Sequence, residues 1–172
     1  MKRTRKLTLS AMFLAIGQIL PFITGQIPQI GKMLCPMHFP ILLCGFVCGP
    51  QFGMITGFIC PLLRSILFNM PVMYPSAIGM AFELMTYGFV TGWPTEKWGK
   101  DSYAKVYMIL IISMIAGRIV WGLAQIVLLG MKGNVFTVSA FLSGALLNAI
   151  PGIILQLLII PFLVRFLDEK PL

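Results

Sequence analysis

The stretch "SMIAGRIVWGLAQIVLL", residues 113–129, is apolar along almost its whole length and carries one charged residue, Arg118. It belongs to a longer apolar segment, about 104–130, which at about 1.5 Å per residue is long enough to cross a hydrocarbon core of about 30 Å as a helix. An arginine within such a helix costs about 2.5–3.5 kcal/mol on insertion scales. Arg118 must therefore meet either another charge of the chain or a negative group outside it.

The composition places the whole chain in a bilayer. Of its 172 residues, 58% are hydrophobic and only 10% are charged. A small soluble domain keeps too much of its surface in water to hide this much apolar area. We therefore predict an all-α integral membrane protein that forms one domain over residues 1–172.

The apolar segments, separated by Gly, Pro and polar residues, predict a compact bundle of about six transmembrane helices. The second is too short to cross the core unaided, and the alternative is a re-entrant hairpin with the third, buried in protein. The expected helices cover about 7–22, 37–49, 51–68, 75 to the polar stretch at 92–102, 104–130 and 138–166.

The net charge of +8 is explained by topology and not by nucleic acid. Basic residues gather before the first apolar segment, in the polar loop at 93–105 and after the last segment. Loops rich in Lys and Arg stay in the cytoplasm. Both termini and this loop are therefore predicted to be cytoplasmic, and no nucleic-acid partner is expected.

Three ionisable residues fall within the predicted spans: Arg64, Glu83 and Arg118. In one interpretation, Glu83 pairs with Arg118 or Arg64 and the set only orients helices. In the other, two cations facing one carboxylate leave a positive charge for the carboxylate or phosphate of a ligand. Backbone carbonyls or snorkelling of Arg64 could also satisfy that charge.

Other polar and aromatic residues share helix faces with these charges or lie near them. Tyr87 is four residues from Glu83, and Trp121 and Gln125 share a face with Arg118. A mixture of polar, aromatic and small groups is typical of small-molecule pockets. The candidate substrate-binding residues are Gln29, Arg64, Glu83, Tyr87, Arg118, Trp121, Gln125 and Asn148.

Small residues recur four positions apart, which lets another helix approach closely. The glycine pairs Gly45/Gly49, Gly53/Gly57 and Gly88/Gly92 predict packing within the bundle. Ala11 and Ala15, on the first helix, form a groove that a partner helix could use.

No motif of an enzyme or a cofactor site is recognisable. The only histidine, His38, forms a C-x-x-H with Cys35, which is weaker than a metal-binding set. We expect no catalytic residue, no metal and no cofactor, and nothing in the chain that hydrolyses ATP.

Several stretches together resemble one family: the substrate-binding S components of energy-coupling factor (ECF) transporters, which take up vitamins. The similarity rests on Ala11 and Ala15 in the first helix, the Gly/Pro-rich loop after it, and segments throughout the chain. These segments are "LCPMHFPILLCGFVCG" (34–49), "PLLRSILFNMP" (61–71), "GMAFELMTYG" (79–88), "AGRIVWG" (116–122) and "LNAIPGIILQLLIIP" (147–161).

The resemblance implies a binding subunit that captures substrate from outside and docks, through Ala11 and Ala15, on a transmembrane coupling subunit driven by two ATPases. Leftover positive charge would suit pantothenate, which is ranked slightly first, and Glu83 with aromatic neighbours would suit a pyridoxine-like ring. The alternatives are a structural membrane scaffold, which needs no pocket, and a proton-coupled carrier that uses Glu83.

Overall fold

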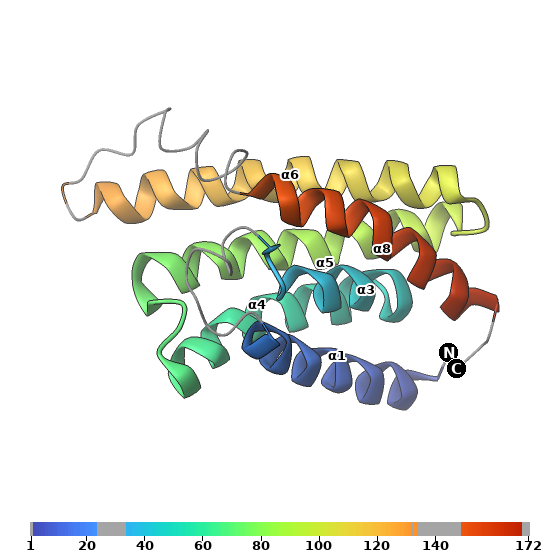
Figure 1. The fold of residues 1–172 in the computed structure, drawn as a ribbon, viewed down its shortest axis with the longest axis horizontal. Coiled ribbons are helices and arrows are strands. Elements are labelled where there is room, and N and C mark those ends of the chain that lie inside the picture. The colour runs from blue at the N-terminus through green and yellow to red at the C-terminus, as the bar shows by residue number, and fades with distance from the viewer. Residues whose placement is uncertain (1, 24–33, 132, 134–148, 170–172) are drawn as a thin grey trace.

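The computed structural model describes residues 2–23, 34–131, 133 and 149–169, and the secondary structure of these residues is entirely helical. Figure 1 shows an elongated bundle in which the start of α1, the end of α8 and the turn between α5 and α6 lie at one end, here named the basal end; the opposite end is named the distal end. The elements are α1 (Arg3–Ile23), α3 (His38–Cys48), α4 (Pro50–Phe68), η1 (Met73–Ala77), α5 (Ile78–Trp98), α6 (Tyr103–Gly130) and α8 (Ile150–Glu169).

The helices α1, α4, α6 and α8 are each long and apolar enough to cross a membrane. Their outward surfaces expose large apolar side chains such as Ile115, Leu123 and Phe162, which suits contact with lipid. Helix α5 has 21 residues but is less apolar, because it carries Glu83 and several glycines and threonines. It packs against α3, α4 and α6, so Glu83 and Thr91 are enclosed by protein. The predicted all-α membrane bundle is confirmed.

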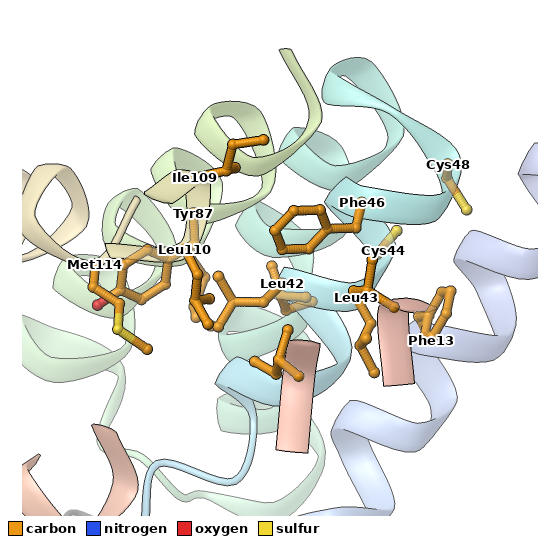
Figure 2. Packing of buried hydrophobic residues seen from close by; sticks show 14 of the residues in the cluster. Phe13, Leu42, Leu43, Cys44, Phe46, Cys48, Tyr87, Ile109, Leu110 and Met114 are labelled. Carbon is orange, nitrogen blue, oxygen red and sulfur yellow. The ribbon is translucent and has the colours of Figure 1, made fainter. Parts of the chain in front are cut away.

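The short helix α3 lies at the centre of the bundle. Its 11 residues span about 16 Å, roughly half of a hydrocarbon core. It contacts α1, α4, α5 and α8. Figure 2 shows Leu42 and Phe46 of α3 between Phe13 of α1 on one side and Tyr87 and Met114 on the other. Because protein surrounds α3, its length need not match the thickness of the bilayer.

Helices α3 and α4 form a tight hairpin that turns at Gly49. Gly49 has φ 91°, in the left-handed region that favours glycine. The hairpin brings the glycines of α3 and α4 against α5. An ideal Cβ on Gly53 would lie 2.6 Å from the carbonyl oxygen of Gly88, and one on Gly57 would meet the backbone of Leu84. The glycine pairs therefore serve close helix packing within the bundle, as predicted.

Two predicted boundaries were wrong at the basal end. Helix α1 begins at Arg3 and not at residue 7, and α5 continues through Pro94 to Trp98. The polar loop expected at 93–105 is therefore confined to residues 99–102. Proline is tolerated in membrane helices when hydroxyl groups and neighbouring helices satisfy the backbone. Here Pro94 is buried, and the neighbouring Gly92 packs against the backbone of Gly49 and Pro50, so protein encloses this turn of α5.

A further difference concerns the start of the fourth predicted helix. It was expected to begin at about 75, but a π-helical turn, η1, covers Met73–Ala77 and α5 follows from Ile78. Tyr74 within η1 has non-helical backbone angles. Its hydroxyl donates to the carbonyl of Leu128 near the end of α6. The distal ends of α5 and α6 are joined by this contact.

Ion pairs join the helix ends at the basal end. Lys6 of α1 lies 3.4 Å from Glu96 of α5, and Lys100 lies 3.4 Å from Asp168 of α8. The guanidinium of Arg165 lies over the ring of Tyr103 at 5.6 Å from its centroid. Ion pairs that are partly open to solvent contribute about 0–1 kcal/mol each. They align the helix ends more than they stabilise the bundle.

We predict that Gly88→Ala destabilises the bundle by about 1–3 kcal/mol, the usual cost of overpacking a tight interior. The new methyl group would collide with the backbone of Gly53. Unfolding in mixed micelles measures the change. Gly130→Ala is the control, because a Cβ there meets nothing within 4 Å. Equal stabilities for the two variants would contradict the close packing of α4 on α5.

Candidate functional site

A group of buried polar side chains surrounds Glu83, which is 1% exposed on α5. Its Oε1 lies 2.9 Å from Nη1 of Arg118 on α6. The Tyr87 hydroxyl, one turn along α5, donates to the same oxygen at 3.0 Å. Nε2 of His38, at the start of α3, lies 3.4 Å from it. One carboxylate oxygen thus connects three helices.

The backbone of α6 makes room for this arrangement beside Arg118. Gly117 lies against the ring of Tyr87, and a Cβ at Gly117 would collide with ring carbons. On the other side, Cys35 has φ 48° and places its Sγ 3.9 Å from Nη2 of Arg118. Together these contacts define the Glu83 cluster: Cys35, His38, Glu83, Tyr87 and Arg118.

The charges of Glu83 and Arg118 balance each other. Two charges removed from water are tolerated only with close pairing and additional hydrogen bonds, and both conditions hold for Glu83. The cluster nevertheless keeps spare donor or acceptor positions. Arg118 Nε and His38 Nδ1 make no hydrogen bond within the part of the chain that the structure describes. The Arg118 side chain is 13% exposed against 2% for Glu83, so Arg118 is the more accessible partner of the pair.

The second intramembrane arginine, Arg64, lies apart from this cluster. It is 3% exposed on α4, and its Nη1 donates to the carbonyl of Gln18 on α1 at 2.5 Å. Its guanidinium carbon lies 4.9 Å from the ring centroid of Phe22 and 5.2 Å from that of Phe68. Of the two pairings considered for Glu83, the structure forms the one with Arg118 and not the one with Arg64.

Trp121 and Gln125 continue the face of α6 that carries Arg118, toward the distal end. Gln125 is 6% exposed. A Cβ on Gly79 of α5 would lie 2.8 Å from Gln125 Nε2 and 3.7 Å from Trp121 Cδ1. Both side chains therefore lie against α5, one and two turns beyond Arg118. The remaining predicted binding residues, Gln29 and Asn148, lie outside the described residues.

Sequence reasoning missed three members of the polar interior. His38 and Cys35 were considered only as a metal pair, whereas both contact the Glu83–Arg118 pair. The signal available was that His38 is the only histidine and opens an otherwise apolar helix. Gln156 of α8 is 2% exposed, and its Nε2 has no partner among the described residues. Its position within the apolar run of α8 was the signal.

The two faces of α1 differ sharply. Ser10, Phe13 and Gly17 are buried against the bundle. Ala11 and Ala15 lie on the opposite, exposed face. Their small side chains leave a shallow stripe between larger exposed residues, which are Leu7, Met12, Ile16, Ile19 and Phe22.

Comparison with protein families gives one match, and it extends over nearly the whole chain. The family model described as the substrate-specific component of ECF transporters matches residues 5–164. Neither the comparison with curated proteins nor that with solved structures gives a significant match. Because the family model covers well over half of the chain, the protein belongs to the ECF transporter substrate-specific components.

Membership of this family defines the general role of the chain. It is a membrane protein and the substrate-binding subunit of an ECF transporter, and such components are transport subunits and not enzymes. The family implies a transported substrate and an ECF module with which the chain assembles. Two features of the structure bear on these roles. The Glu83 cluster is the candidate for substrate binding, and the exposed face of α1 is the candidate for contact with the ECF module.

We predict that Glu83→Gln lowers the free energy of unfolding by about 3–5 kcal/mol, because it leaves the buried Arg118 without its counter-charge. The matched control is Glu96→Gln, which breaks the exposed pair with Lys6 and should cost about 0–1 kcal/mol. Unfolding in mixed micelles compares the two variants.

Replacing both partners should recover much of the lost stability, since no uncompensated charge then remains. We expect Glu83→Met/Arg118→Met to be closer to the unmodified protein than Glu83→Gln is. If Glu83→Gln were as mild as Glu96→Gln, the ion pair would not be the organising contact of this cluster.

Proposed function

We propose that this subunit binds a vitamin or a related small polar molecule on the distal side of the Glu83 cluster. The observation that carries the proposal is that Arg118 Nε and His38 Nδ1 are buried and have no hydrogen-bond partner among the residues that the structure describes. Buried polar groups are normally hydrogen-bonded. A bound substrate would supply the missing partners.

The binding residues proposed first are Arg118, Trp121 and Gln125, with Glu83 and Tyr87 behind them. Arg118 offers donors, Gln125 a donor and an acceptor, and Trp121 an aromatic surface. Glu83 is already enclosed by its partners, so its role is to hold Arg118 in place. Gln29 and Asn148, which lie outside the described residues, are kept as proposed binding residues on the sequence alone.

The balance of charge bears on the identity of the substrate. Pantothenate was ranked first because one cation had no counter-charge. That cation is Arg64, whose contacts come from α1 and α4, while Arg118 is neutralised by Glu83. A site of no net charge with an aromatic wall suits a hydroxylated nitrogen ring. We therefore place a pyridoxine-like substrate ahead of pantothenate.

We further propose a bacterial plasma-membrane protein with several spans and both termini in the cytoplasm. The distribution of basic residues supports this orientation, and the start of α1 and the end of α8 lie together at the basal end (Figure 1). The distal end, with the proposed substrate site, would then face outward. Substrate would then be captured at the distal end, outside the cell, while the ATPases would act on the cytoplasmic side, where the basal end lies.

Docking on the transmembrane coupling subunit is assigned to Ala11 and Ala15 of α1, and ATP hydrolysis to two partner ATPases. The exposed position of both alanines supports this assignment. Small side chains allow a close helix–helix contact in which van der Waals packing supplies the affinity. The substrate site and the docking face involve different helices.

Mass spectrometry of small molecules released from purified protein tests substrate binding. After soaking with pyridoxine, pantothenate and other vitamins, we expect one ligand in the unmodified protein and about tenfold less in Gln125→Ala, which loses a buried hydrogen-bonding group. Ile126→Ala, its lipid-exposed neighbour, is the control. A ligand retained equally by Gln125→Ala would remove Gln125 from the site, and no ligand in any sample would count against the proposed capture.

Docking is tested by Ala11→Trp, which fills the stripe on α1. We expect loss of copurification with the ECF module and of uptake, with substrate binding to the isolated subunit unchanged. The control is Ile115→Trp on the exposed face of α6. If both variants assembled normally, α1 would not be the docking helix.

A further inference from the structure

Two reciprocal hydrogen bonds fasten the distal half of α1 to α4. The Arg64 side chain donates to the backbone carbonyl of Gln18 at 2.5 Å. In return, the Gln18 side chain donates from Nε2 to the backbone carbonyl of Cys60 at 2.9 Å. Each helix thus contributes one side-chain donor and one backbone acceptor. This pair of contacts is named the α1–α4 clasp.

The surroundings of Arg64 suit a fixed structural contact and not a ligand. No ion pair of Arg64 occurs within the described ranges, and the charge is met by the Gln18 carbonyl and by the rings of Phe22 and Phe68. The planar guanidinium can donate and stack at once, which the ammonium of lysine cannot. The Phe22 and Phe68 rings also meet edge to face, with centroids 4.9 Å apart. The clasp therefore joins the distal ends of both helices.

The clasp meets α1 beside the proposed docking stripe, because the half-buried Gln18 lies three residues after Ala15 and seven after Ala11. Gly17 packs beside it, with an ideal Cβ only 2.7 Å from Cys60 Sγ, while Ala11 and Ala15 are exposed. Successive residues of a helix are separated by about 100°. A small rotation of α1 would therefore turn the stripe away from its partner and bring a larger side chain forward.

We propose that Arg64 is a positioning residue for assembly: with Gln18 it sets the rotation and depth of α1, so that the alanine stripe is presented to the ECF module. This inference rests on the proposed docking through α1. It removes Arg64 from the substrate site and assigns it to the coupling step. Substrate binding on the α5–α6 side does not depend on the clasp.

The first test compares Arg64→Gln and Arg64→Lys with the unmodified protein in two assays. We expect the affinity for purified ECF module to fall about tenfold or more in both, since the hydrogen bond of a charged donor is lost or displaced. The dissociation constant of the substrate from the isolated subunit should stay unchanged. Equal loss in both assays, or normal assembly of Arg64→Gln, would overturn the inference.

A rescue experiment separates positioning from a general loss of fold. In Gly17→Cys/Arg64→Gln, the new cysteine lies close to native Cys60, near enough for a disulfide after a small adjustment. Oxidation should lock α1 on α4 and restore assembly, while the reduced sample stays defective. Gly17→Cys alone, oxidised, is the control and should assemble normally. A locked protein that still failed to assemble would refute the positioning role.

The two proposals fail in different ways. If Ala11→Trp assembled normally, the docking role of α1 itself would be wrong. If Ala11→Trp blocked assembly and Arg64→Gln did not, docking through α1 would stand and only the role of the clasp would be rejected.

Discussion

The buried ion pair between Glu83 and Arg118 is the contact on which the arrangement of the interior depends. Hydrocarbon offers no water to either charge, so each needs a partner at hydrogen-bond distance. The pair fixes the relative depth of α5 and α6, and the Tyr87 hydroxyl and His38 bond to or approach the same carboxylate oxygen. One charge pair therefore also determines where α3 can begin. The substrate site is proposed on the side of the pair where Arg118 remains accessible.

A second constraint comes from the close approach of α3, α4 and α5. Gly53 of α4 and Gly88 of α5 let the two backbones approach so closely that a methyl group on either residue would not fit. Helix α3 is enclosed by this packing and by α1 and α8. A short helix in a membrane is tolerable when its ends meet protein and not lipid. The outer helices α1, α4, α6 and α8 are long and apolar enough to cross a hydrocarbon core. Helices α3 and α5 are instead shaped by packing against neighbouring helices, so α3 can be short and α5 can carry polar residues.

The two arginines within the membrane have similar costs of burial but different solutions. Arg118 is matched by a carboxylate, and its Nε has no hydrogen-bond partner among the described residues, which supports the proposed small-molecule site beside it. Arg64 is matched by a carbonyl and two aromatic rings, contacts that bind one helix to another. In the functions proposed for them, substrate recognition and assembly depend on different charges on different helices. Such a separation would allow the substrate site to vary without disturbing the docking surface.

The sequence by itself determined the membrane class, the all-helical fold, most helix positions and the need of each intramembrane charge for a partner. These follow from apolar length and from the energetics of burial, which are local properties of the chain. The end of α5 was mispredicted because proline and charge are local signals of a loop, yet α5 packs against the start of α4 at Gly92 and continues to Trp98. Only the tertiary structure decided that Glu83 pairs with Arg118, that His38 joins them and that Arg64 contacts α1. Helical periodicity gives the face of each residue but not the rotation and depth of one helix against another, and those depend on side-chain packing across the whole bundle.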